Sequence, residues 1–178
     1  DLGIGDRITV YTANMIIPRI GENLTRSGSI SPPACCPVCG GPTKIQKNNE
    51  VESLYCINPD CDAKRVKSFT LFVSRDAMNI DGLSEATLEK FIAKGFIHQY
   101  RDIFHLEEHC DAIMEMEGFG EKSYNNLIES IDAARTVELP NLIYSLGISN
   151  IGLANAKVIC RYYDYNLDAM RKAHAEEL

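Results

Sequence analysis

Cys36-Pro-Val-Cys39-Gly40 and Cys56-Ile-Asn-Pro-Asp-Cys61 are the two stretches that decide the fold in the middle of this chain. Their combined spacing, C-x2-C-x16-C-x4-C, suits a tetrahedral zinc ion, because each tight turn delivers two thiolates. Gly40 lets the first turn bend back so that backbone amides can point at sulfur. Four thiolates leave no open coordination position, so we expect a structural Zn²⁺ held by Cys36, Cys39, Cys56 and Cys61.

The other readings of these cysteines are a set of buried free thiols and a redox-active disulfide pair. Cys35 is a spare thiol that could compete with Cys36 for the metal, whereas Cys110 and Cys160 lie on apolar helical faces and read as core residues. Seven cysteines with this clustering are typical of metal binding in a reducing compartment. We therefore expect a cytoplasmic protein.

Towards the N-terminus, residues 1–20 read as strands. Ile8, Val10 and Thr12 alternate with other residues, a turn is expected at Ala13-Asn14, and the next apolar run is expected to stop at Pro18. Twenty residues cannot close a sheet, and the chain lacks an initial Met, so we expect the end of a domain whose start is missing. Residues 21–35 are rich in Gly, Ser and Pro and read as a linker.

Towards the C-terminus, the pattern is helical from Val66 onward. One apolar face joins Phe69, Phe72 and Val73, and another joins Leu88, Phe91 and Ile92. Further helices are expected over residues 100–115, 122–134, 139–146, 154–163 and 167–176.

This second half contains an internal repeat of helix, short glycine-type hairpin and helix, at spacings of 36 and 32 residues. The hairpins align as Gly82-Leu83-Ser84, Gly118-Phe119-Gly120 and Asn150-Ile151-Gly152. A Gly-x-Gly turn before a helix lets a phosphate approach free backbone N–H groups, and such contacts read the DNA backbone rather than its sequence. We expect the second hairpin to be the strongest binder, then the third, then the first. The candidate DNA-binding residues are Gly82, Gly118, Phe119, Gly120, Lys122, Ser123, Asn150, Ile151 and Gly152.

Charge and composition exclude several classes of protein. The net charge of −7 argues against a basic DNA clamp, and 45% hydrophobic residues argue against global disorder. Residues 31–75 hold six Lys and Arg against four Asp and Glu, whereas residues 76–178 hold nine against eighteen. A DNA-binding role must therefore rely on backbone amides with a few cations. No long apolar run or signal peptide is present, so we expect no membrane contact.

These motifs, in this order, resemble the C-terminal part of bacterial NAD-dependent DNA ligase. GDRITVYTANMIIPRI (5–20) resembles the last strands of its OB-fold, and CPVCGGP (36–42) with YCINPDCDA (55–63) resembles its zinc finger. IDGLSEATLEKFI (80–92), MEGFGEKSYNNLIESI (116–131) and SLGISNIGLANAKVI (145–159) resemble its helix-hairpin-helix units. Ser84 and Ala86 stand where that family usually has Gly and Lys. The fourth hairpin, the BRCT module and the adenylation domain of the family are not present.

The resemblance implies a mainly α fold with a small β part. Its domains are the end of an OB-fold with a linker (1–30), a four-cysteine zinc finger (31–66) and a helix-hairpin-helix domain (67–178). It also implies that the full-length enzyme seals nicks in duplex DNA during replication and repair, using NAD and Mg²⁺. This piece would clamp the duplex beside the rest of the ligase chain, as a monomer, and would have no catalytic residue because no KxDG occurs. The alternatives are a zinc-stapled protein–protein scaffold and a helix-hairpin-helix module of another DNA-repair protein.

Overall fold

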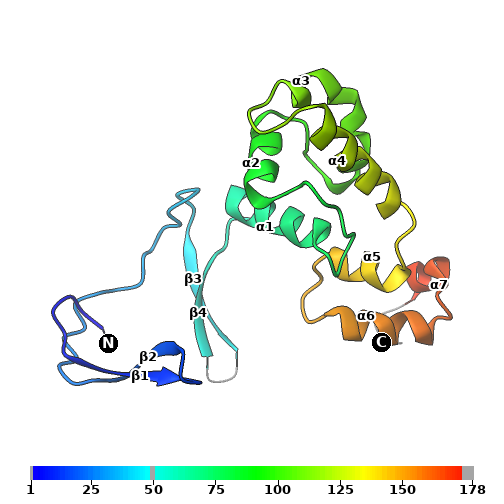
Figure 1. The fold of residues 1–178 in the computed structure, drawn as a ribbon. Coiled ribbons are helices and arrows are strands. Elements are labelled where there is room, and N and C mark those ends of the chain that lie inside the picture. The colour runs from blue at the N-terminus through cyan, green and yellow to red at the C-terminus, as the bar shows by residue number, and fades with distance from the viewer. Residues whose placement is uncertain (1, 49–50, 174–178) are drawn as a thin grey trace. The chain divides into compact units, whose positions relative to one another are not determined.

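The computed structural model describes residues 2–48 and 51–173 and divides the chain into two compact units (Figure 1). The first unit is Asp1–Cys61 and contains all four strands. The second is Asp62–Leu178 and contains all the described helices. The cysteine cluster and the three hairpins thus belong to different units, and each unit is described by itself.

The first unit begins with an antiparallel hairpin of β1 (Ile8–Ala13) and β2 (Ile17–Asn23). The predicted turn is confirmed, since Asn14 has a φ of 51° and is followed by Met15 at 62°. The predicted stop at Pro18 is wrong, because Pro18 lies inside β2 opposite Thr12. Proline is accepted in a strand whose N–H would face away from a partner, and β2 pairs only with β1 in the described ranges. The predicted linker therefore loses residues 21–23 to β2.

A second antiparallel ribbon joins the two cysteine turns. Strands β3 (Thr43–Asn48) and β4 (Val51–Cys56) pair without interruption from Thr43 opposite Cys56 to Asn48 opposite Val51. The sequence predicted the turns but not this ribbon, because its residues show no clear apolar alternation. The ribbon brings the start of β3, which follows the first turn, next to Cys56 at the end of β4.

The second unit is helical. Its elements are α1 (Asp62–Val73), α2 (Glu85–Ala93), the 3-10 segment η1 (Tyr100–His109), α3 (Cys110–Met114), α4 (Glu121–Ala134), α5 (Leu139–Ser145), α6 (Leu153–Tyr162) and α7 (Leu167–Lys172). The single helix expected over 100–115 is wrong, because η1 is kinked at His105, where φ is −125°. The other expected helices are present within one or two residues, except that α7 ends at Lys172. Residues 174–176 of that prediction lie outside the described residues.

One apolar cluster forms the core of the helical unit. It contains the predicted faces of α1 and α2, with Phe69 and Phe72 at 2% and 3% exposure and Leu88 and Phe91 fully buried. Every member of the cluster lies between Phe69 and Leu142. The two antiparallel ribbons of the first unit contribute none of it. No helix within the described residues has the length and apolar character needed to cross a bilayer.

Candidate functional site

The four predicted ligand cysteines come together in the first unit. Their Sγ atoms all lie within 4.8 Å of one another, with Cys36 and Cys61 at 3.9 Å and Cys39 and Cys56 at 3.6 Å. Zinc–sulfur bonds of about 2.3 Å place tetrahedral sulfurs roughly 3.8 Å apart. The donor set and spacing therefore fit a zinc ion, and four thiolates are soft ligands that select zinc over magnesium or calcium. No other cluster of this kind occurs in residues 2–48 and 51–173.

Two neighbouring glycines shape the first cysteine turn in different ways. Gly40 has a φ of +67°, and its N–H donates to the Cys36 carbonyl at 2.9 Å, as the sequence predicted for a turn that bends back. Gly41 donates its N–H to Cys39 Sγ at 3.4 Å. A Cβ at Gly41 would lie 3.0 Å from Asn58 Cβ and 3.2 Å from Cys39 Sγ. The cysteine spacing did not reveal Gly41, whose role is to give the two turns room to meet.

Backbone N–H groups prepare two of the thiols to ionise. The Gly41 N–H and then the Asn58 amide lower the pKa of Cys39 to about 6. The N–H groups of Cys39 and Val38 lower the pKa of Cys36. Burial raises the pKa of Cys56 to about 11, so this thiol needs a cation beside it to ionise. The cluster is therefore arranged for a metal rather than for four independent thiols.

Three cations that lie near the cysteines in sequence make their contacts elsewhere. Lys47 pairs with Glu52 at 3.9 Å, and Lys67 pairs with Glu85 at 2.8 Å. Arg65 donates to the Ile97 carbonyl at 3.3 Å. The spare thiols divide as expected: Cys35 is exposed, Cys160 is buried and Cys110 packs against the core.

The three hairpins of the helical unit share one backbone geometry. The first residue of each has a left-handed φ: +89° at Gly82, +89° at Gly118 and +66° at Asn150. The third residue of each, Ser84, Gly120 or Gly152, is the N-cap of the following helix. Four residues later stand Leu88, Tyr124 and Ala156, all buried. The repeat inferred from sequence is thus visible in backbone angles, caps and burial.

A polar side chain three residues after each N-cap ties its hairpin together. The Ser123 hydroxyl accepts from Gly120 N and donates to Gly120 O, both at 2.9 Å. The Asn155 amide donates to the Asn150 carbonyl at 2.9 Å. In the first hairpin the Thr87 and Ser84 hydroxyls are 2.9 Å apart. Ser123 therefore uses its hydrogen inside the turn, and a bond from it to a phosphate would first require that contact to break.

The surroundings of the hairpins differ in charge. Helices α2 and α4 carry an acid in the first turn, Glu85 and Glu121 respectively. Helix α6 has no acid in its first turn and carries Lys157 in its second. Lys122 is exposed beside Glu121. Of the three hairpins, the third therefore has the helix N-terminus that repels a bound anion least.

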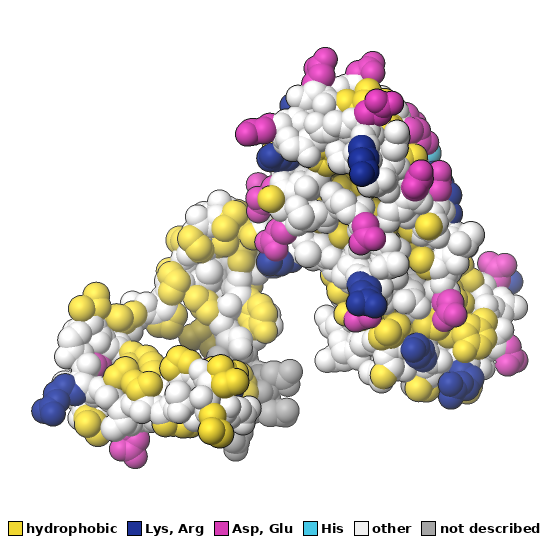
Figure 2. Space-filling view, viewed as in Figure 1, with side chains coloured by type: hydrophobic (Ala, Val, Ile, Leu, Met, Phe, Trp, Pro, Cys, Tyr) yellow, Lys and Arg dark blue, Asp and Glu magenta, His cyan; other side chains and the backbone are white. Residues whose placement is uncertain are grey.

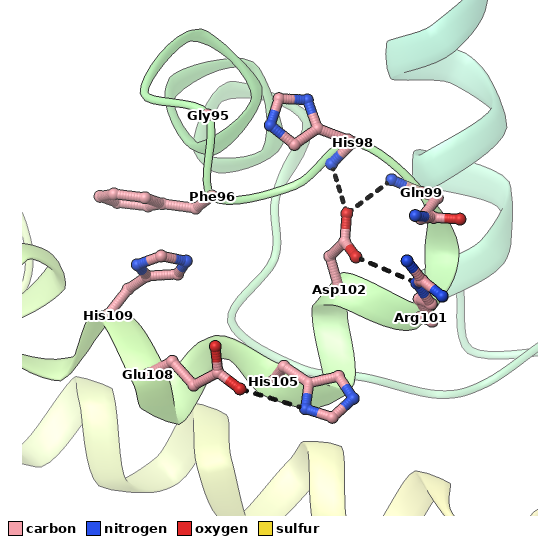
Figure 3. A pocket seen from close by; sticks show the side chains of 9 residues that line it. All are labelled: Gly95, Phe96, His98, Gln99, Arg101, Asp102, His105, Glu108 and His109. Atoms are coloured by element: carbon pink, nitrogen blue, oxygen red, sulfur yellow. Dashed lines mark hydrogen bonds and ion pairs between the residues drawn. The ribbon is translucent and has the colours of Figure 1, made fainter.

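Three histidines, His98, His105 and His109, line one open hollow of about 490 Å³ (Figure 3). His105 faces Glu108 at 3.5 Å, and His109 stacks on Phe96. Asp102 at the hollow accepts from the backbone N–H groups of His98 and Gln99 at 2.8 and 2.9 Å. These side chains make contacts with their neighbours and do not point toward one common position. The fourth histidine, His174, lies outside the described residues.

Comparison with known proteins gives one consistent result. No protein-family model matches the chain. The chain is 58% identical, over all of its 178 residues, to the DNA ligases of Lachnoclostridium phytofermentans and Ruminiclostridium cellulolyticum, and it covers 27% of each. It is also 35% identical, again along its whole length, to the DNA ligase of Fusobacterium nucleatum, of which it covers 26%. The chain therefore spans about a quarter of the length of the curated relatives it matches.

Proposed function

Because this chain is homologous over its whole length to a segment of DNA ligases, we propose that it is the DNA-holding part of an NAD-dependent DNA ligase. In that role it clamps duplex backbone near a nick without reading sequence. The observation that supports this most directly is the threefold recurrence of a left-handed residue, an apolar plug and an exposed helix N-cap. Helix N-termini of this kind present free N–H groups and a positive dipole end to phosphate.

The hairpins are proposed to be helix-hairpin-helix units, and the contacts to be made by Gly82, Gly118, Phe119, Gly120, Lys122, Asn150, Ile151 and Gly152. Nothing lies within 4 Å of a Cβ placed at Gly120 or Gly152, and neither has a left-handed φ. Glycine at these two N-caps is therefore required neither by backbone strain nor by packing. Open access for a phosphate explains its presence. Ser123 is better assigned to shaping the second hairpin.

The cysteine cluster is proposed to hold a structural Zn²⁺ through Cys36, Cys39, Cys56 and Cys61. Bound there, zinc neutralises the thiolates and supplies folding energy to residues 34–61. This segment has no apolar core of its own, because only Cys36 and Cys61 in it are buried among the described residues. The zinc module spans 31–66 in this proposal and precedes a helix-hairpin-helix domain over 67–178.

Residues 1–30 are proposed to be the last strands of an OB-fold and its exit linker. Val10, Ile17 and Ile20 of the β1–β2 hairpin are 60%, 52% and 50% exposed, and Figure 2 shows hydrophobic side chains gathered over this hairpin. Two strands alone cannot bury such a surface. The exposed apolar side chains fit a hairpin that pairs with further strands in the longer relatives.

Catalysis is proposed to lie outside this chain. The nucleophilic lysine that carries AMP, the NAD site and the Mg²⁺ site would belong to the rest of the enzyme, which acts in the cytoplasm. The chain alone should therefore bind nicked DNA and seal none of it.

Fluorescence anisotropy with a nicked duplex across a salt series tests DNA binding. The affinity should fall steeply as salt rises, since each phosphate contact contributes about −0.9 to the slope of log K against log salt. Gly120→Val should weaken binding roughly tenfold with unchanged helical content, because valine fits the backbone but blocks the approach. Ala133→Val, at an exposed position near the C-terminal end of the same helix α4, is the matched control. If Gly120→Val binds the duplex as tightly as the wild type, the proposal that the second hairpin contacts DNA is wrong.

A protein–protein scaffold is the second candidate, favoured by the net charge of −7 and by the acidic side chains that Figure 2 shows over the α2–α4 region. The same experiment separates the two candidates. A scaffold would ignore the duplex at every salt concentration. A helix-hairpin-helix module of another repair protein would bind DNA, but the full-length identity to DNA ligases disfavours it.

A further inference from the structure

Asn58 lies where the two cysteine turns of the first unit meet. It belongs to the second turn, between Cys56 and Cys61, and is half-buried. A Cβ placed at Gly41 of the first turn would lie 3.0 Å from Asn58 Cβ, 3.2 Å from Cys39 Sγ and 3.5 Å from Asn58 Nδ2. The side chain of Asn58 therefore lies against the first turn, beside one of its two sulfurs.

Hydrogen bonds on both sides of Asn58 fix its position and the orientation of its amide. The Ile57 N–H donates to the Pro42 carbonyl at 3.0 Å, so the backbone that leads into Asn58 is bound to the first turn. Asn58 Oδ1 accepts from the Asp60 N–H at 3.0 Å, in the turn that asparagine side chains form with the backbone two residues on. Because the oxygen is used in this turn, the amide nitrogen is the end that faces the first turn.

Asn58 donates to one thiol in each turn. Its side-chain amide donates to Cys39 and its backbone N–H donates to Cys56. These two sulfurs form the 3.6 Å pair of the cluster. Cys39 thus receives donors from both turns, since the Gly41 N–H also donates to its Sγ at 3.4 Å. Four thiolates around one Zn²⁺ carry a net negative charge, and N–H donors that point at sulfur offset it.

We propose that Asn58 is a positioning residue of the metal site, whose two donors hold the Cys39 and Cys56 thiolates at the spacing that a tetrahedral ion requires. The inference rests on the proposed zinc-binding function and assigns a residue that is not itself a ligand. Groups that hydrogen-bond to metal ligands orient them and tune their affinity for the metal. This role goes beyond forming the turn, which aspartate could do equally well at this position.

Two substitutions separate the amide donor from the turn. Asn58→Asp keeps an oxygen for the Asp60 N–H but places a second oxygen, in place of the donor, beside Cys39. Asn58→Ser can also accept from Asp60, more weakly, and is too short to donate to the sulfur. Zinc affinity should fall about tenfold in Asn58→Ser and about a hundredfold in Asn58→Asp, because the carboxylate repels the thiolate. A residue that served only the turn would give the opposite order.

Competition with a chromogenic chelator measures the zinc affinity of the whole chain and its variants, and cobalt(II) substitution reports on the thiolates themselves. The thiolate-to-cobalt charge-transfer band should move to longer wavelength in both variants, because a sulfur lone pair that loses an N–H donor rises in energy. The ligand-field bands of tetrahedral cobalt should persist, which would show that the four sulfurs still assemble around the metal.

Gln46→Glu is the matched control for charge, since Gln46 is exposed on β3 opposite Ser53, away from both cysteine turns. It should keep the wild-type zinc affinity and the wild-type cobalt spectrum. An unshifted charge-transfer band in Asn58→Ser overturns the proposal, even if Asn58→Asp fails to assemble the site. A lower affinity for Asn58→Ser than for Asn58→Asp also overturns it. A wild-type chain that binds no zinc would refute the metal site as a whole, and this role of Asn58 with it.

Discussion

Gly40 and Gly41 show how two adjacent glycines serve one metal site for different reasons. Gly40 supplies a left-handed φ, and Gly41 supplies space beside Cys39. Gly41→Ala should lower zinc affinity by about tenfold, because the new Cβ pushes Cys39 Sγ and Asn58 apart and displaces the N–H that points at sulfur. Competition with a chromogenic chelator measures this affinity.

Gly40→Ala is the comparison that separates space from strain. Nothing lies within 4 Å of a Cβ there, so the substitution costs only the left-handed conformation, about 1 kcal/mol. We expect a smaller loss of affinity than for Gly41→Ala. Equal zinc affinities of wild type and Gly41→Ala would show that the close approach at Gly41 is not required.

Asp102 is predicted to make folding stability depend on pH. The His98 N–H, then the Gln99 N–H and the Arg101 guanidinium, hold the pKa of this carboxyl below its ordinary value. Because the folded pKa is the lower one, the stabilisation is present above an unfolded pKa of about 3.9 and is lost as pH falls through the folded value. Asp102→Asn should cost roughly 1 kcal/mol at pH 7. Urea unfolding at pH 7 and pH 3 should show the gap to wild type shrinking at the lower pH.

Residues whose role depends on a neighbour close in sequence were predictable, and those that depend on distant neighbours were not. Gly40 and Asn14 were identified because their turns are local. Gly41 was missed because the atom that forbids a side chain belongs to Asn58, seventeen residues away in sequence. Pro18 was misread because a proline stops a strand only where its N–H is needed, and that depends on the second partner strand.

At the scale of elements, the charge at each helix start should rank the hairpins. Glu121 opens α4 and would repel a phosphate at Gly120, so Glu121→Gln should strengthen duplex binding about twofold at low salt. Glu129→Gln on the same helix makes the same charge change about 12 Å further along and should have little effect. Anisotropy titrations of both variants provide the measurement. Equal gains from the two would indicate a response to net charge rather than to a local contact.

Elements with a periodic apolar pattern were predicted well, and irregular ones were not. Helix α4 and helix α6 follow their repeat position by position, so aligning the hairpins found both. The prediction of one continuous helix over the η1 segment failed because the buried residues Ile103 and Leu106 are spaced as on a helical face. The kink at His105 shows only in the backbone angles. The β3–β4 ribbon failed because both its faces are largely exposed, which removes the alternation that marks a strand.

At the scale of the whole chain, composition and spacing predicted the mixture of zinc module and helices but not which surfaces stay open. Tyr162 of α6 is 70% exposed although Ala156 and Cys160 of the same helix are fully buried, and a sequence pattern alone does not reveal that difference. The same holds for the grouping of His98, His105 and His109, which depends on the kinked η1 segment. Which residues are exposed depends on how the helices pack, and the sequence pattern alone does not predict that packing.

The division into two units predicts that metal and helices can be separated. Every residue of the main apolar cluster of the helical unit lies between Phe69 and Leu142, so this cluster has no member in the unit that holds the cysteines. Removing zinc with a chelator, or replacing Cys39 with Ser, should therefore unfold residues 34–61 and leave the helical circular dichroism signal almost unchanged, because metal binding is the folding energy of that segment alone. Hydrogen exchange should show lost protection in β3 and β4 and retained protection in α1 and α4. Cooperative loss of the helices on chelation would mean that the cysteine cluster stabilises the whole chain, and the helical unit would then no longer count as an independent support for the hairpins.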